Sequence, residues 1–431
     1  MASFKECSIK FPKGAQNNQL DLKNPILFLD EKSETFYAYG DGSIIYKSKD
    51  LLQWSSIELE GVSFSHPGIS KYKHEYRIYS TAQDSIVLYT SISPEGPFEY
   101  RCTVLKSQPE LEFFADCPSV SSDAKTEQQY LICGKNGAGV FAIPLDNPTG
   151  LLMAKSTPIC LARRPKWMSS AVSEGFIVYH PTTKYYYLFV TYGEQGCDSN
   201  IRVARSKNIT GPYADSNGNS LLDLDDFQCN IGQMCLSGYQ FDHSYGYISP
   251  SRPSIVKTAK NSWYASHSIC PVDENDNPKE ALMQIREIKW SSTGWPLLSP
   301  CVFAGEHTQQ MQKEWLIGDY EFIKFMPTVP QEVCYYVVLH LLAPTDEDQD
   351  PNRQKDAWAY AVPKDSMGRV NLGESIRGSW RLINETTLEI TYWNYIETYR
   401  ILPAWDTELN CQTIILTGKD SNGYACMAKK Y

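Results

Sequence analysis

The chain has 431 residues, a formal net charge of −10, 42% hydrophobic residues and 28 tyrosines. A chain of this length can bury a large core, in one or two domains. The negative charge and the lack of a long Lys/Arg run argue against nucleic acid as a partner. No stretch approaches the length of about 18 apolar residues that a membrane-spanning helix needs, so no membrane span is expected.

The start of the chain and its cysteines predict the compartment. The first 20 residues contain no apolar core of the kind found in secretory signals. The 13 cysteines are an odd number and lack the spacing of a disulfide framework or a CxxC motif. Cysteines in apolar strand contexts are typical of buried free thiols. We therefore expect a cytoplasmic or other reducing intracellular location.

A pattern that recurs along the first 300 or so residues predicts the fold. Each copy opens with a polar residue beside a Pro or Gly and continues as an apolar strand, a turn, an aromatic strand and a third strand that ends in a turn. Such runs, rich in Tyr, Val and Ile, are typical of antiparallel strands. The copies are residues 24–54, 66–98, 117–150, 166–213 and 252–296. Five copies at intervals of roughly 40 to 75 residues predict a five-bladed β-propeller whose first strands line the axis.

The residues that open the five first strands are expected to meet at one end of the central channel. They are Asn24, His66, Cys117, Glu174 and Arg252.

Three further expectations concern the segments around the blades. The polar lead-in, residues 1–20, is expected to close the ring by pairing with the last blade. The segments SPEGPF, DNPTG and ITGPY are interpreted as one outer turn used three times. The insertion between residues 215 and 248 is interpreted as a loop over one propeller face.

The repeat stops near Glu314, and short alternating strands follow at intervals of roughly 8 to 12 residues. This spacing predicts a small antiparallel β-barrel or sandwich. The fold class is therefore all-β, with a five-bladed propeller at residues 1–312 and a C-terminal β-barrel domain at residues 313–431.

Several segments resemble glycoside hydrolase family 43, and in particular its two-domain endo-1,5-α-L-arabinanases. SEGFIVYHPTTKYYYLFVTYG resembles the family's general-acid strand, and IRVARSKNITGPYAD the outer edge of that blade. IREIKWSSTGWPLLSPCVFAGE resembles the end of the last blade, while GESIRGSWRL, AWDTE and GYACMAKKY resemble the appended barrel. The resemblance covers nearly the full length.

The resemblance implies an inverting hydrolysis with two carboxyl groups, one protonating the leaving oxygen and the other activating water. Glu174 matches the general acid, although Glu-Gly-Phe replaces the family's Glu-Ala-Pro. The base Asp of the family falls on Asn24. A further Asp, which tunes the acid and orients substrate, and a His that helps to hold calcium complete the family's site.

The remaining family positions are also substituted. The second-blade Asp falls on Gly68, and the third-blade Asp falls on Cys117, with Asp116 one residue earlier. The last-blade His falls on Arg252. Replacing Asp by Asn, Asp by Cys and His by Arg raises the local charge by about three units. We therefore expect that calcium is lost, that no metal or other cofactor is bound, and that Arg252 occupies the cation's place, paired with Glu174.

Loss of the base bears directly on activity. An amide does not accept a proton from water near neutral pH, and losing a general base costs roughly 10²- to 10⁴-fold in rate. A shift of one residue in a strand turns a side chain to the other face, so Asp116 is not a simple replacement for the missing Asp. The favoured interpretation is a degenerate arabinanase-like propeller that acts as an intracellular interaction or structural module, with protein partners in a larger assembly.

Two alternatives stay open because fold alone does not decide function. One is an active or weakly active hydrolase with Glu174 as general acid and a base relocated to Asp116, Asp30 or Asp41. The other is a non-catalytic propeller that binds arabinan-type or other glycans.

Further residues were considered as ligand contacts. Asn24, His66, Asp116, Trp167 and His267 are possible ligand-contacting residues, with Trp167, Tyr239 and Tyr245 as candidates for an aromatic platform. The plainer interpretations are polar residues that satisfy one another in the channel and, for His267, a core position. Cys117 is more readily explained as packing than as a nucleophile.

Overall fold

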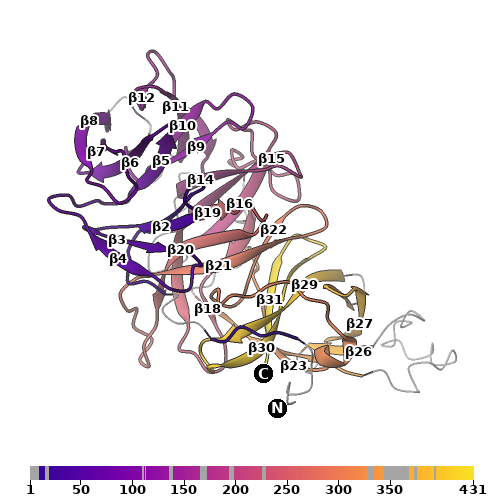
Figure 1. The fold of residues 1–431 in the computed structure, drawn as a ribbon. Coiled ribbons are helices and arrows are strands. Elements are labelled where there is room, and N and C mark those ends of the chain that lie inside the picture. The colour runs from indigo at the N-terminus through magenta and orange to yellow at the C-terminus, as the bar shows by residue number, and fades with distance from the viewer. Residues whose placement is uncertain are drawn as a thin grey trace.

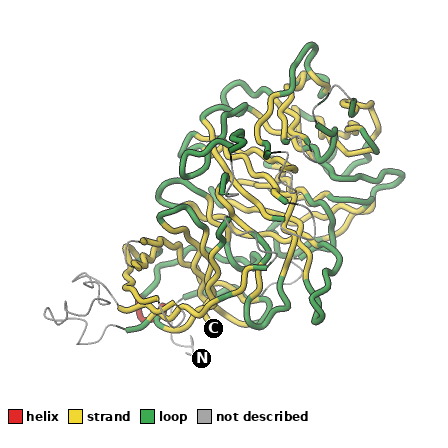
Figure 2. Tube along the Cα trace, turned by 180° about the vertical axis from the view of Figure 1, so that it is seen from behind, coloured by secondary structure: helices red, strands yellow, loops and turns green. Residues whose placement is uncertain are grey.

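The computed structural model describes residues 9–14, 19–108, 111, 113–134, 139–165, 172–193, 199–225, 230–327, 333–343, 368–372, 376–392 and 395–431. Nearly all of this chain is strand and loop, as Figures 1 and 2 show. The one helix among the described residues, α1 (Lys313–Leu316), spans a single turn and is far too short to cross a lipid bilayer. The predicted all-β class is confirmed.

Five antiparallel sheets, arranged around an axis, confirm the predicted propeller (Figure 1). Blade 1 contains β1 (Ile26–Asp30), β2 (Thr35–Tyr39), β3 (Ile44–Ser48) and β4 (Ser55–Glu58). Blade 2 contains β5 (Gly68–Tyr72), β6 (Glu75–Ala82), β7 (Ser85–Ser91) and β8 (Glu99–Lys106). Blade 3 contains β9 (Ser119–Ser122), β10 (Gln129–Cys133), β11 (Val140–Asp146), β12 (Leu151–Leu152) and β13 (Ile159–Ala162).

The last two blades complete the ring. Blade 4 contains β14 (Val172–His180), β15 (Tyr185–Tyr192), β16 (Asn200–Ser206) and β17 (Gln233–Leu236). Blade 5 contains β19 (Tyr247–Lys257), β20 (Trp263–Pro271), β21 (Leu282–Trp290) and β22 (Pro296–Leu298), with β18 (Tyr239–Gln240) beside β19.

Each blade has at least one more strand than the three that the repeat predicted. The outermost strands β4 and β8 are mostly exposed, so their sequences lack the apolar pattern that marks the inner strands. In blade 4 the outer strand β17 comes from within residues 215–248. The interpretation of that insertion as a loop alone is therefore wrong for this part of it.

The predicted pairing of the lead-in with the last blade is confirmed at Leu20, whereas the three outer turns share one feature but are not one turn used three times, because Gly96 and Gly211 donate to the carbonyl three residues earlier and Gly150 to the one four residues earlier. Leu20 and Met283 exchange backbone hydrogen bonds of 3.2 and 2.8 Å, so the lead-in pairs with blade 5 and helps to close the ring. The three outer turns each place a glycine at positive φ, namely Gly96 (84°), Gly150 (72°) and Gly211 (85°). Glycine adopts this conformation without the strain that a side chain brings.

The C-terminal domain is a closed antiparallel barrel, as predicted. Its described strands are β23 (Gly318–Lys324), β25 (Val337–Leu341), β26 (Gly368–Leu372), β27 (Ile376–Asn384), β28 (Thr387–Tyr392), β29 (Tyr395–Asp406), β30 (Cys411–Asp420) and β31 (Ala425–Lys430). Side chains alternate along each strand. Phe322 packs in the barrel core, while its neighbour Ile323 packs against blades 4 and 5 in a shared apolar cluster.

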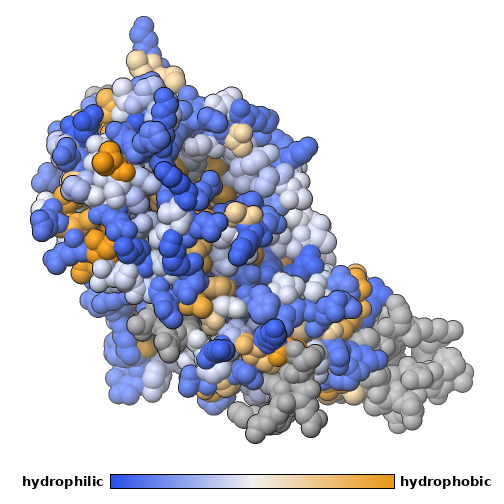
Figure 3. All heavy atoms as spheres, viewed as in Figure 1, coloured by the Kyte–Doolittle hydropathy of each residue, from blue (hydrophilic) through white to orange (hydrophobic). Residues whose placement is uncertain are grey.

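Two segments cross between the domains. Ile9 and Phe11, near the start of the chain, pack against the barrel core. β24 (Cys334–Tyr335), which follows β23, pairs in parallel with β18 and so extends the sheet of blade 5. The last blade strand ends at Leu298, and the first barrel strand begins at Gly318. Figure 3 shows polar residues over most of one face of the molecule, with apolar residues scattered among them.

Candidate functional site

The five residues that were predicted to converge share an uncommon backbone conformation. Their φ angles are 48° for Asn24, 45° for His66, 53° for Cys117, 57° for Glu174 and 54° for Arg252. A positive φ is rare for residues other than glycine and costs about 1–2 kcal/mol each. Its recurrence at the start of all five inner strands shows that each blade enters the channel through the same kink. The contacts below connect all five residues.

Glu174 lies at the bulge where β14 enters the channel. Its Oε2 accepts hydrogen bonds from the Thr191 hydroxyl (2.8 Å) and from the backbone N–H of Arg252 (2.8 Å). The Cys117 thiol faces its other oxygen, Oε1, with 3.9 Å between Sγ and Oε1. The carboxylate is therefore fixed by two donors on one oxygen and has its second oxygen toward Cys117.

Arg252 is 4% exposed, and its guanidinium spans the channel. Its Nη2 nitrogen donates to the backbone carbonyls of His66 (2.8 Å), Pro67 (2.8 Å) and Pro118 (3.0 Å). The expected pairing with Glu174 therefore runs through the Arg252 backbone, and the side chain instead ties blade 5 to blades 2 and 3.

Asn24, which the resemblance aligns with the family's base Asp, interacts with a neighbouring carboxylate. Its Nδ2 donates to Oδ2 of Asp41 (2.7 Å), and the backbone N–H of His66 donates to Oδ1 of the same residue (2.7 Å). Asp41 thus bridges blades 1 and 2. It was considered only as a relocated base, and its bridging role came from no sequence signal.

Cys117 is fully buried, and its backbone N–H is capped by two acceptors. These are Oδ1 of Asp116 (2.7 Å) and the Thr81 hydroxyl (3.2 Å), which itself donates to Asp116 (2.8 Å). Asp116 Oδ1 also lies 3.9 Å from Nδ1 of His66. The Asp116 carboxylate therefore stays at this end of the channel although it comes one residue before the family position.

Gly68, which the resemblance aligns with the family's second-blade Asp, lies where blades 2 and 3 approach each other closely. A Cβ at this position would lie 2.4 Å from the carbonyl oxygen of Pro118, which is closer than real atoms approach. Blades 2 and 3 meet so closely here that no side chain fits, and the same Pro118 carbonyl accepts from Arg252.

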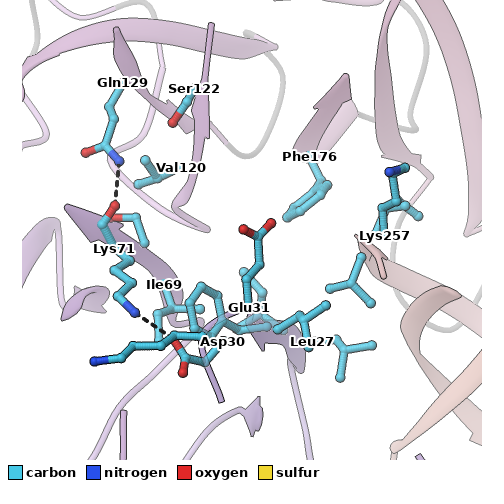
Figure 4. A pocket seen from close by; sticks show the side chains of 17 residues that line it. Leu27, Asp30, Glu31, Ile69, Lys71, Val120, Ser122, Gln129, Phe176 and Lys257 are labelled. Atoms are coloured by element: carbon cyan, nitrogen blue, oxygen red, sulfur yellow. Dashed lines mark hydrogen bonds and ion pairs between the residues drawn. The ribbon is translucent and has the colours of Figure 1, made fainter. Parts of the chain in front are cut away.

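Below these residues the channel widens into a cavity of about 550 Å³ lined by all five inner strands. Figure 4 shows Lys71 reaching Asp30 at the far end, with Phe176 on the other side of the cavity. The Lys71 ammonium is 2.6 Å from Oδ1 of Asp30, which also accepts from the Tyr76 hydroxyl. Asp30 ends β1 and lies six residues beyond Asn24, about 20 Å along an extended strand. Asp30 is therefore too far away to be a base beside Glu174.

Two buried polar atoms line the same cavity without a protein hydrogen-bond partner, Oγ of Ser70 and Oε1 of Gln129. The amide nitrogen of Gln129 donates to the backbone of Lys71 (3.2 Å; Figure 4). The cavity wall is therefore partly polar.

Two of the remaining predicted residues are His267 and Trp167. His267 is 1% exposed, and its ring accepts from Arg286 (3.1 Å) and contacts the Ser268 carbonyl (3.1 Å). Burial, and then the nearby Arg286 charge, lower the His267 pKa to about 3. Both ring nitrogens are engaged, so His267 is an interior residue of blade 5 and does not contact a ligand. Trp167 lies outside the described residues.

The two tyrosines proposed for an aromatic platform differ. Tyr239 is buried and stacks on Tyr247, so it offers no surface to a sugar. Tyr245 is 58% exposed.

Sequence reasoning missed Thr191 and Thr81, which hold Glu174 and Asp116, because a threonine inside a strand carries no signal of such a role.

The resemblance places Arg252 where the family has a His that helps to hold calcium. Arg252 carries no acceptor, and its guanidinium already occupies three carbonyl oxygens. A different set of ligand atoms does converge nearby: His66, Cys117 and Glu174 each offer one atom within 4.8 Å of the other two.

Comparison with known proteins identifies the family. The model of glycosyl hydrolases family 43 matches residues 30–296, and a C-terminal lipocalin-like domain of that family matches residues 300–428. Extracellular endo-α-(1→5)-L-arabinanase 2 of Bacillus subtilis (strain 168) is 22% identical over 462 aligned positions, which cover 93% of this chain and 91% of the relative. An extracellular endo-α-(1→5)-L-arabinanase of Thermotoga petrophila is 24% identical over an alignment that covers 67% of this chain and 73% of the relative.

Solved structures show the same two-domain fold. A crystal structure of endo-1,5-α-L-arabinanase from Thermotoga petrophila RKU-1 superposes with a TM-score of 0.79 at 19% identity, covering 97% of this chain and 100% of the other. The family 43 YxiA protein of Bacillus licheniformis gives the same TM-score and identity, with 97% and 99% coverage. The chain therefore belongs to glycosyl hydrolases family 43, with the two-domain arrangement of the arabinanases.

Proposed function

We propose that this chain is an arabinanase-like propeller that has lost the hydrolysis of its family and acts as an interaction or structural module. The observation that carries the proposal is the state of the base position. Asn24 is an amide whose nitrogen donates to Asp41, so it neither accepts a proton nor directs water. Gly68 and Cys117 remove two further carboxylates, and the Gly68 position has no room to regain one.

The same proposal includes loss of the family's calcium. In this proposal the guanidinium of Arg252 takes the role of the calcium ion. It supplies a positive charge that binds three backbone carbonyls. A structural substitute of this kind keeps blades 2, 3 and 5 together without a metal. The partner would then be another protein of a larger assembly, bound on the propeller surface.

The proposed location is a reducing intracellular compartment. All ten cysteines within the described ranges are free thiols, and several are fully buried. Burial raises the pKa of the Cys235 thiol well above its ordinary value, which keeps it protonated and unreactive. The named relatives are extracellular by description, so location is one of the properties in which this chain would differ.

A second candidate is an active arabinan hydrolase with Glu174 as general acid. It is favoured by two carboxylates, Asp41 and Asp116, that remain at the same end of the channel. Asp30 is no longer a candidate base because it lies at the opposite end, bound to Lys71. A third candidate, glycan binding without hydrolysis, has Tyr245 as its exposed aromatic residue among those described.

The test is an assay of the purified protein on linear 1,5-α-arabinan and aryl arabinosides, with and without calcium. We expect no turnover above the blank for the parent and none for Glu174→Gln. Glu58→Gln serves as a control, because Glu58 is an exposed carboxylate on β4. Asn24→Asp asks whether restoring the base is sufficient to recover hydrolysis.

The outcomes separate the candidates. Turnover by the parent that Glu174→Gln abolishes would overturn the proposal, and Asp41→Asn and Asp116→Asn would then identify the base. Binding of arabino-oligosaccharides in calorimetry without turnover would favour the glycan-binding propeller. If neither turnover nor glycan binding is observed, the result supports the interaction module. Capture of partners on the native protein is then the next step.

A further inference from the structure

The residues that replace the family's carboxylates bring three metal-ligating groups together. His66, Cys117 and Glu174 come from blades 2, 3 and 4, and their ligand atoms lie within 4.8 Å of one another. Cys117 Sγ and Glu174 Oε1 are 3.9 Å apart. In a tetrahedral site with bonds of about 2.0–2.3 Å, ligand atoms lie about 3.5 Å apart. Small side-chain movements therefore bring the cluster to metal-binding distances.

Two of the three groups, Glu174 and His66, are held in place by neighbours. Oε2 of Glu174 is fixed by Thr191 and by the backbone of Arg252, which orients Oε1 toward Cys117. Nδ1 of His66 lies 3.1 Å from the Ser65 hydroxyl and 3.9 Å from Asp116. Metal-binding histidines commonly have such a partner on the second ring nitrogen, which fixes the ring and its tautomer.

The ligand types select the metal. A thiolate, an imidazole and one carboxylate suit zinc and related soft or borderline ions, whereas calcium requires six to eight oxygen ligands. Three protein ligands also leave a fourth position for water, as in open zinc sites. The Arg252 guanidinium lies beside the cluster, where it donates to the backbone carbonyls of His66 and Pro118.

The local charge supports a divalent ion. The charged side chains with printed contacts at this end of the channel include Asp41, Asp116, Glu174 and Arg252. Their sum is −2 with His66 neutral, and ionisation of Cys117 makes it −3. A divalent cation brings the sum to −1, so the ion reduces the charge imbalance.

We propose that His66, Cys117 and Glu174 bind one thiophilic divalent metal ion of the zinc class at the rim of the channel. The cluster exists because Cys and His stand where the family has Asp-bearing motifs, so the site would have arisen from the same substitutions that removed hydrolysis. The proposal concerns binding alone and holds whether or not the chain turns over a glycan.

The test uses the full-length protein, freed of metal with a chelator and kept reduced. Zn²⁺ is titrated by calorimetry in two buffers of different ionisation enthalpy, and Co²⁺ is titrated by absorbance. We expect one ion per chain, release of a proton as the thiol ionises, and a thiolate-to-cobalt charge-transfer band. Calcium is not expected to compete.

Variants make the result specific. Cys117→Ser should abolish the charge-transfer band, and Cys117→Ser, His66→Gln and Glu174→Gln should each weaken Zn²⁺ binding by at least about 100-fold, more than the 10- to 100-fold typical of an outer residue such as Asp116. Cys235→Ser is the matched control, because Cys235 is a buried thiol on β17 away from the rim. It should bind as the parent does. Circular dichroism and the unfolding midpoint show that each variant is folded.

Three results would overturn the proposal. The first is no stoichiometric binding in the parent, and the second is binding that Cys117→Ser leaves unchanged. The third is a cobalt spectrum without thiolate character, which would show that the ions bind only at the surface. The metal titration contains no glycan, so a failure to bind metal does not change the interpretation of the hydrolysis assay. Turnover in the hydrolysis assay likewise does not test this metal site.

Discussion

The two ends of the axial channel hold their charged groups differently. At the far end, Asp30 is satisfied by the side chains of Lys71, Tyr76 and Ser33, on backbone of ordinary conformation. At the rim, Glu174 and Arg252 bind mainly backbone groups and threonine, on backbone at positive φ. The first arrangement is a closed ion pair that stabilises the fold. The second arrangement has a strained backbone at positive φ. Such strain persists where the surrounding structure enforces it, and it often marks a functional site.

The largest effect is expected from Arg252, the residue that joins three blades at the rim. Arg252→Met removes the charge and leaves the buried carbonyls of His66, Pro67 and Pro118 without their donor. We expect a loss of about 3–5 kcal/mol in the free energy of unfolding, measured by urea denaturation. Arg101→Met, at an exposed position on β8, is the control and should change it by less than about 0.5 kcal/mol. An Arg252 variant as stable as this control would show that the guanidinium is not structural.

A smaller effect is expected at the far end, where Lys71 pairs with buried Asp30. Lys71 is partly exposed, so Lys71→Met should cost about 2–3 kcal/mol, below the range for fully buried pairs. Burial opposes ionisation of Asp30, but hydrogen bonds from Lys71, Ser33 and Tyr76 outweigh it and hold the Asp30 pKa well below its ordinary value of 3.8.

The sign of the pH dependence follows from that lowered pKa. The stability due to ionised Asp30 is complete above the unfolded-state pKa of 3.8 and is lost as pH falls from there toward the lower folded-state pKa. The advantage of the parent over Asp30→Asn in urea denaturation should therefore shrink below pH 4 or so. An advantage that stays constant between about pH 5 and pH 2 would contradict the ion-pair interpretation.

The smallest effect measures the strain at the rim directly. At Cys117, where φ is 53°, the Gly variant should be more stable than the Ala variant by about 1 kcal/mol, because only Gly adopts this conformation without strain. At Ser119, two residues later in β9, the order should reverse, with Ala better by about 0.5–1 kcal/mol. The four variants are compared by urea denaturation. If the Gly and Ala variants had the same order of stability at both positions, the positive φ at Cys117 would not be a source of strain at the rim.

Much of the fold could be predicted because it depends on local patterns. Apolar runs, turns and their fivefold recurrence indicate blades, and the polar residue that opens each copy of the repeat is then an equivalent position. The outer strands β4 and β8 escaped prediction because their exposed faces impose no apolar pattern. The strand β17 escaped because a long insertion separates it from its blade.

The sequence by itself predicted a family 43-like propeller with a barrel, and the resemblance aligned Asn24 with the family's base Asp. Only the tertiary structure decided what the substituted residues do. That Arg252 meets Glu174 through its backbone, that Asp41 joins Asn24 to His66, and that Gly68 has no room for a side chain are contacts between different blades. Such contacts depend on how closely and at what angle the blades approach. A repeat pattern contains no information on that distance, because it describes each blade separately.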